Sequence, residues 1–208
     1  MRILFCLLFG YFVGSLNPAA WVASKTNIPL EERGTKNLGA SNVFLVVGKK
    51  WGMVVLCFDV LKAYFSAFLA EALFPGLPVA GLLAGGGAVV GHVFPFYMGF
   101  RGGKGLASFA GMVLSYDPST FLFLFVLCGS LMLLANYSFV APLSAGVLFP
   151  VLALFRSRDL WVFLICGIAG ALVFCKNLKN VRRDLEGDTD KIRDSMKEVF
   201  LERQKEET

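Results

Sequence analysis

The segment GHVFPFYMGFRGGKG, residues 91–105, gathers the residue types of this chain that could handle an anion. It holds the single histidine, His92, the cations Arg101 and Lys104, and five glycines. Two of these glycines stand beside Lys104 where the next apolar segment begins, which suits a phosphate held at a helix N-terminus. The spacing is not that of a P-loop. A basic membrane anchor with a tight turn fits the same letters about equally well.

A second polar stretch, EERGTKNLGASNV, spans residues 31–43 and mixes glycines with hydroxyl and amide side chains. Glycine lets the backbone take conformations in which several N–H groups converge on an anion. Clusters of Gly, Asn and Ser also commonly mark turns. The stretch is therefore either part of an anion site or a solvated connection between two helices.

Asp59, Lys62 and His92 are ionisable residues inside apolar segments, where charges are costly unless they are paired or hydrated. Asp59 and Lys62 are three positions apart, so they can pair on one face of a helix. This pair is either part of a functional site or a structural ion pair with a snorkelling lysine. His92 is either a catalytic group or, as we expect, a buried hydrogen-bond donor that bridges helices, away from the substrate site.

Polar and helix-loosening residues also interrupt the first apolar segment, in GYFVGSLNPAAW. Ser15 and Asn17 are polar, and Gly14 and Pro18 weaken the helix. Packing of helices through small residues explains the same pattern.

The chain offers no pattern of metal ligands. Its five cysteines all lie in apolar segments without ligand spacing, and they are interpreted as small buried hydrophobes. We expect no metal, no cofactor and no nucleic-acid partner.

The elements that must position these residues are apolar. Of the 208 residues, 56% are hydrophobic and 17% are charged, and the mean hydropathy is +0.66. Such a chain is typical of an integral membrane protein, whose spanning helices need about 20 apolar residues each. We predict an all-α membrane bundle of seven transmembrane helices. The apolar segments are Ile3–Ala23, Trp51–Phe74, Leu77–Tyr97, Leu106–Ser115, Thr120–Ala135, Phe139–Phe155 and Leu160–Cys175.

The fourth apolar segment, Leu106–Ser115, is too short to span alone, so we expect it to be partly unwound or shielded by protein. We expect one transmembrane domain over residues 1–185, followed by a charged cytoplasmic tail over residues 186–208. With seven spans, 16 of the 20 Lys and Arg residues fall on one side and 3 on the other. This asymmetry predicts an outside N-terminus, a cytoplasmic C-terminus and polar clusters that face the cytoplasm.

Four motifs make the sequence resemble the bacterial membrane glycerol-3-phosphate acyltransferases of the PlsY family. Gly14-Ser15 matches an early GS, and GTKNLGASN, residues 34–42, matches the family loop GSGNxGxTN. DVLKA, residues 59–63, matches D-x-x-K-G, and residues 91–105 match GHxxPxxxxFKGGKG with order and spacing kept. The resemblance extends to about Leu185 and is most specific in the last motif.

The resemblance implies a monomeric, multi-pass protein of the inner membrane with a cytoplasmic active site. Its activity would be transfer of an acyl group from acyl-phosphate to the 1-hydroxyl of glycerol-3-phosphate, giving lysophosphatidate, the first step of phospholipid synthesis. No protein nucleophile is needed, because the donor is activated and the enzyme supplies proximity and electrostatic stabilisation.

The resemblance also assigns roles to individual residues. Catalytic roles fall to Lys104, Asn180 and Ser41. Binding of substrate phosphate falls to Gly34, Thr35, Lys36, Asn37, Gly39, Asn42, Arg101, Gly102 and Gly103. Structural or supporting roles fall to Ser15, Asp59, Lys62 and His92.

This chain departs from the family pattern at several of the positions that contact substrate. Leu45 stands where the family has an arginine, and Phe139 and Pro142 replace serines. Asn177 replaces a histidine near the end of the last helix, which leaves the phosphate of the substrate as the proton acceptor. The alternative to an active acyltransferase is a diverged relative, non-catalytic or with another acceptor, that binds a phosphorylated or lipid ligand at the membrane.

Overall fold

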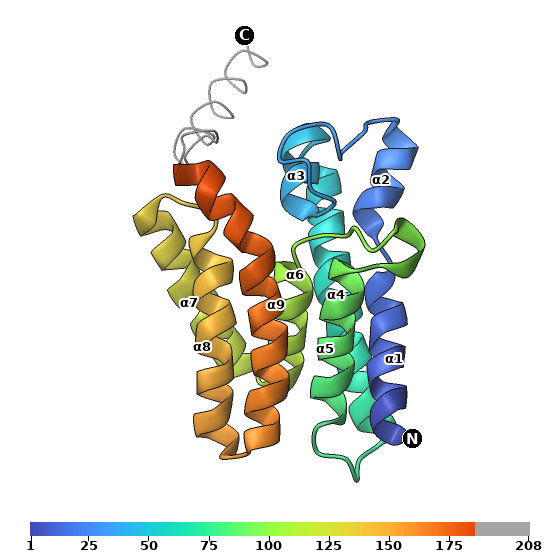
Figure 1. Ribbon diagram of the computed structural model, residues 1–208, viewed down its shortest axis with the longest axis vertical. Coiled ribbons are helices and arrows are strands. Elements are labelled where there is room, and N and C mark those ends of the chain that lie inside the picture. The colour runs from blue at the N-terminus through green and yellow to red at the C-terminus, as the bar shows by residue number, and fades with distance from the viewer. Residues whose placement is uncertain (186–208) are drawn as a thin grey trace.

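The computed structural model describes residues 1–185, except for the side chains of residues 179, 180 and 182–185, and this part of the chain is helical without strands (Figure 1). The predicted all-α fold is therefore confirmed for the described residues. The helices are α1 (Arg2–Ser15), α2 (Pro18–Thr26), α3 (Ala40–Val46), α4 (Lys49–Leu73), α5 (Ala80–Val93), η1 (Phe96–Met98), α6 (Leu106–Tyr116), α7 (Pro118–Ala135), α8 (Val140–Ser157) and α9 (Leu160–Leu185).

Six helical stretches in the described part are long and apolar enough to cross a membrane, with α1 and α2 counted together. The predicted short segment is the 11-residue helix α6. At 1.5 Å per residue it extends about 16 Å, roughly half of a 30 Å hydrocarbon core. It packs against α4, α5, α7 and α9, which is the shielding by protein that the sequence led us to expect.

The first apolar segment is broken in two, where the sequence pattern suggested one loosened helix. Helix α1 ends at Ser15, and α2 begins at Pro18, whose fixed φ suits the first position of a helix. The Asn17 side chain caps α2, because its Oδ1 accepts a hydrogen bond from the Ala20 N–H at 3.0 Å. The break leaves the Leu16 carbonyl free to bind outside the helix.

Helices α1 and α5 approach so closely that only glycine fits at their contact. A Cβ at Gly10 or Gly14 would collide with the α5 backbone, and one at Gly87 or Gly91 would collide with the α1 backbone. Close approach through small residues is a usual way of packing membrane helices. This contact holds the end of α5, and so the segment that follows it, in a fixed place beside the α1–α2 break.

An apolar core lies between α6, α8 and α9. Phe109 of α6 and Phe149 of α8 are buried and meet edge to face, with ring centroids 5.5 Å apart. Gly146 and Gly170 bring α8 and α9 into backbone contact. Helix α7 is largely exposed, as a helix that faces lipid would be.

The polar segments gather at one end of the bundle. Figure 1 shows the start of α1 and the described end of α9 at opposite ends, with α2, α3 and the α7–α8 turn at the α9 end. The segment between α5 and α6 lies toward the same end. The predicted charged tail, residues 186–208, lies outside the described residues.

Candidate active site

A pocket of about 1560 Å³ lies between α3 and α4 on one side and α6, α7, α8 and α9 on the other. Apart from Asp59 and His92, most of its polar groups come from the α2–α3 connection with the start of α3, the segment just before α6, the α7–α8 turn and α9. They include Thr35, Asn37, Ser41, Lys104, Asn136, Tyr137, Ser138 and Asn177. The pocket thus joins four segments that are distant in the sequence.

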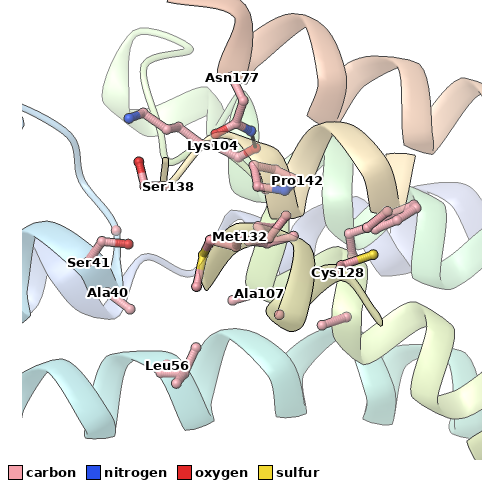
Figure 2. Close-up of a pocket in the computed structure, with 18 of the residues that line it drawn as sticks. Ala40, Ser41, Leu56, Lys104, Ala107, Cys128, Met132, Ser138, Pro142 and Asn177 are labelled. Carbon is pink, nitrogen blue, oxygen red and sulfur yellow. Dashed lines mark hydrogen bonds between the residues drawn. The ribbon is translucent and has the colours of Figure 1, made fainter. Parts of the chain in front are cut away.

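The rest of the pocket is mostly apolar and follows the lengths of α6 and α7. On α7 the lining includes Phe121, Leu124, Cys128 and Met132, which recur every three or four residues along one helical face. Figure 2 shows Met132 and Cys128 on this wall, with Ala107 of α6 and Leu56 of α4 also lining the pocket. The pocket is therefore amphipathic, with a polar end and a long apolar part.

Asn42 organises the loop that precedes α3. It is fully buried, and its Oδ1 accepts a hydrogen bond from the Thr35 N–H at 2.7 Å. Its Nδ2 donates to the carbonyls of Leu30 at 2.8 Å and Arg33 at 3.1 Å. These bonds occupy both ends of the amide, so in this structure Asn42 shapes the loop from within.

The glycine-lysine segment leads directly into α6, as the sequence predicted. Gly102 donates its N–H to the Val93 carbonyl, and Gly103 donates to the His92 carbonyl, both at 3.1 Å. Gly105 then takes a left-handed φ of 88° before the first turn of α6. The two glycine N–H groups that were predicted to cradle phosphate therefore anchor the segment to α5.

Lys104 enters the pocket beside α9. The Asn177 Nδ2 donates to the Val173 carbonyl at 2.8 Å and approaches the Lys104 carbonyl at 3.4 Å. In Figure 2 the ends of the Lys104 and Ser138 side chains lie on the same side of the pocket as Ser41. An ammonium and two hydroxyls thus surround the polar end, which suits an anionic group.

The predicted ion pair inside α4 is confirmed. The Lys62 Nζ lies 2.7 Å from Asp59 Oδ1, and both side chains are buried. His92 is also buried, and its Nδ1 lies 3.0 Å from Lys62 Nζ. The same Nδ1 lies 3.2 Å from Asp59 Oδ1. The expected burial of His92 and its contact with another helix are confirmed, whereas its place in the lining of the pocket differs from the expectation.

The structure brings some of the predicted site residues together and separates others. The pocket is lined by Gly34, Thr35, Asn37, Gly39, Ser41, Asp59, His92 and Lys104. Lys36 and Arg101 are exposed at the rim of their loops and do not line it. Ser15 is buried, and its hydroxyl donates to the Tyr11 carbonyl at 2.8 Å. The side chain of Asn180 lies outside the described part.

The resemblance pointed to the region of the turn between α7 and α8, through the serines that Phe139 and Pro142 replace. It gave no role to Asn136, Tyr137 or Ser138, which form the polar part of this turn and line the pocket. Apart from the resemblance, their signal was a short polar run between two apolar segments, which is also the signal of an ordinary turn. The departures Leu45 and Asn177 line the pocket as well, so both alter its surface.

Fold and pocket define an integral-membrane helical bundle with an amphipathic site, and comparison with known proteins assigns its family. The family model for glycerol-3-phosphate acyltransferase matches residues 4–187. A glycerol-3-phosphate acyltransferase of Aquifex aeolicus is 30% identical over 90% of this chain and 97% of its own length. One of Bacillus velezensis is 31% identical over 93% of this chain and 99% of its own length.

Solved structures agree with the sequence relatives. The crystal structure of PlsY, an integral membrane glycerol 3-phosphate acyltransferase, in its glycerol 3-phosphate form has a TM-score of 0.85. It is 29% identical, over 92% of this chain and 96% of that one. The lysophosphatidic acid form has a TM-score of 0.82, over 92% and 95%. The chain belongs to the glycerol-3-phosphate acyltransferase family, and the predicted resemblance is confirmed.

Proposed function

We propose that this protein is a membrane acyltransferase that moves a fatty acyl group from acyl-phosphate to the 1-hydroxyl of glycerol-3-phosphate. The observation that supports this most strongly is the pocket, in which a polar end with Lys104 continues into an apolar face along α6 and α7. An acyl donor is itself amphiphilic, so its chain suits the apolar part and its phosphate the polar end. The family match favours this function over a non-catalytic relative.

The reaction requires no covalent intermediate with the protein. The glycerol oxygen forms a bond to the acyl carbonyl carbon, and the bond between that carbon and the phosphate oxygen breaks. The leaving phosphate takes the electron pair, and the hydroxyl proton passes to a phosphate oxygen. The products are lysophosphatidate and orthophosphate. Asn177, which lines the pocket, has no titratable group, so a substrate phosphate is the acceptor that fits this chain.

The protein's part is to hold the two substrates and to stabilise charge. We assign Lys104 to the phosphate groups, Ser41 to hydrogen bonding at the same end, and Asn180 to orientation of the hydroxyl or of the leaving phosphate. Fixed geometry of this kind can lower a barrier by about 7–11 kcal/mol. The loop residues Gly34, Thr35, Asn37 and Gly39 line the pocket and are the candidates for backbone or side-chain contact with phosphate.

In this proposal the remaining residues that were predicted to bind phosphate contribute without contacting the substrate in the pocket. Asn42, Gly102 and Gly103 keep the two loops in shape through the hydrogen bonds described above. Lys36 and Arg101 add positive charge at the exposed rim, which attracts anionic substrates before they bind.

We further propose that α6 is a seventh crossing, completed by the polar segment before it. The loops then face the cytoplasm, as the excess of Lys and Arg on that side indicates. The protein would be a multi-pass monomer of the inner membrane, with one domain over residues 1–185.

The proposed function is tested by incubating purified protein with acyl-phosphate and glycerol-3-phosphate and identifying the lipid product by mass spectrometry. We expect lysophosphatidate only when both substrates are present. Binding of either substrate without turnover would support the diverged relative instead.

A further inference from the structure

The Lys62 ammonium is a junction between three elements. It donates to the Leu16 carbonyl at 2.7 Å, at the α1–α2 break, and it lies 3.0 Å from His92 Nδ1, near the end of α5. It lies 2.7 Å from Asp59 Oδ1 on its own helix. Three polar neighbours, the Leu16 carbonyl, Asp59 Oδ1 and His92 Nδ1, thus surround this ammonium. Lys62 therefore fixes where the end of α5 lies relative to α1 and α4.

The same contacts fix the position of the His92 ring. Its Nδ1 lies 3.0 Å from Lys62 Nζ and 3.2 Å from Asp59 Oδ1, so the ion pair of α4 holds the ring on this side. Nε2 faces Gly103, since a Cβ added at that residue would collide with it. A Cβ at Gly102 would collide with the His92 carbonyl. The ring and backbone of His92 are thus in direct contact with the segment that carries Lys104.

The connection between α2 and α3 also comes close to Gly103. The Leu38 carbonyl would lie 3.0 Å from a Cβ at Gly103, and it is approached by the Asn17 Nδ2 at 3.5 Å. His92 and Gly103 therefore stand where the two loops of the polar end meet. A shift of the His92 ring would move Gly103 and change how Lys104 and the loop at 34–42 face each other.

We propose that Lys62 and His92 are positioning residues for acyl transfer. Lys62 holds the His92 ring, and the ring holds Gly103, so that Lys104 keeps its place at the polar end of the pocket seen in Figure 2. Both act through the loop and not on the substrate. The inference rests on the proposed function, because the position of Lys104 affects a reaction rate only if the protein transfers an acyl group. A displacement near 1 Å in such a site can cost about 100-fold in rate.

Hydrogen exchange at the loop tests the positioning without any need for turnover. His92→Ala and the double variant Asp59→Asn/Lys62→Met are compared with wild type by mass spectrometry of peptides that cover residues 99–106. The double variant avoids leaving Asp59 as an unpaired buried charge. We expect faster exchange of the Gly102 and Gly103 amides in both variants, with α7, α8 and α9 unchanged. Wild-type exchange at this segment, or equal acceleration throughout the protein, would overturn the proposal.

The control for general destabilisation is Asp117→Ala. Asp117 caps α7 at the other end of the bundle and does not line the pocket. This variant should lower the melting temperature without changing exchange at residues 99–106 or the kcat/KM for glycerol-3-phosphate. If it reproduces the His92→Ala effect at the loop, a structural role explains both and the positioning role is lost.

Kinetics of a mutant cycle supply the second readout. We expect His92→Ala to lower kcat/KM for glycerol-3-phosphate by about tenfold to 100-fold. Because Lys62 acts through His92, the triple variant with all three changes should have a kcat/KM no lower than that of the less active of its two parent variants. If the fold-losses in kcat/KM of the two parent variants multiply in the triple variant, Lys62 and His92 act independently, which would contradict the proposal. If wild type makes no lysophosphatidate, the proposed function fails, while the exchange measurements still decide the positioning.

Discussion

At the scale of the residue, the contribution of the Lys104 charge to phosphate binding can be measured by removing that charge. Lys104→Ala deletes charge-assisted hydrogen bonds worth about 1.5–3 kcal/mol, which corresponds to a loss of affinity for glycerol-3-phosphate of roughly tenfold to 150-fold. The measurement is calorimetric titration of the purified variant. Lys104→Arg, which keeps the charge, is the matched control. Unchanged affinity in a folded Lys104→Ala protein would leave this lysine with a role in topology alone.

Two further residues test how this chain works without the family's histidine and arginine. Leu45 and Asn177 both line the pocket, so Leu45→Arg with Asn177→His adds a phosphate contact and a base where substrate would lie. We expect the double variant to be faster than wild type, with a pH–rate profile that gains an ionisation near the ordinary histidine pKa of about 6.5. A folded double variant with the wild-type rate and profile would show that the cations already present suffice.

Some of these residues could be assigned from the sequence and others could not. Asp59 and Lys62 were predicted as a pair because their spacing alone places them on one helical face. The third partner, His92, is 30 residues further along the chain, and no local pattern links it to Lys62. The same holds for Asn42, whose amide is satisfied by backbone groups of its own loop. Composition marks a loop as polar, but only coordinates show which polar groups face inward.

At the scale of the element, the start of α7 supports a prediction about pH. Asp117 accepts hydrogen bonds from the Thr120 hydroxyl at 2.6 Å and the Thr120 N–H at 2.7 Å, and it pairs with Arg156 at 3.0 Å. The Thr120 hydroxyl, its N–H and the Arg156 charge hold the pKa of Asp117 below its ordinary value of 3.8. A lowered carboxyl pKa stabilises the fold above the unfolded pKa and ceases to do so as pH falls through the folded one.

Asp117→Ala should therefore destabilise the protein at pH 7 by about 0.5–2 kcal/mol, the usual value of a helix N-cap. The measurement is the melting temperature of both proteins in detergent from pH 7 down to pH 3. We expect the difference between them to shrink below about pH 4. A constant difference over the whole range would mean that the charge of Asp117 contributes nothing.

The elements themselves were largely predictable, because long apolar runs in a membrane chain have few structures open to them. The predicted segments correspond to α1 with α2, α4, α5 with η1, and α6 to α9. The break after Ser15 was only suggested, since Asn17 and Pro18 fit both a loosened helix and a restart. Packing of the first helix through small residues was considered, but its partner α5 was not predicted. The glycines of a sequence indicate where a close approach is sterically allowed, but not which backbone makes it.

At the scale of the whole molecule, the orientation in the membrane is open to a direct test. The excess of Lys and Arg at the loop end predicts a cytoplasmic C-terminus. A reporter enzyme that is active only outside the cytoplasm, fused after Thr208, should be inactive, while one fused before Met1 should be active. The reverse pattern would place the pocket on the outer face and remove its access to cytoplasmic substrates.

The central claim is that the pocket transfers an acyl group between two phosphate-bearing substrates. The most direct measurement counts lysophosphatidate and orthophosphate in the same reaction of purified protein with acyl-phosphate, with and without glycerol-3-phosphate. We expect both products in equal amounts when the acceptor is present, neither above background when it is absent, and a strongly reduced rate for Lys104→Ala. Release of orthophosphate without lysophosphatidate, or no release by a folded protein that binds both substrates, would contradict the claim.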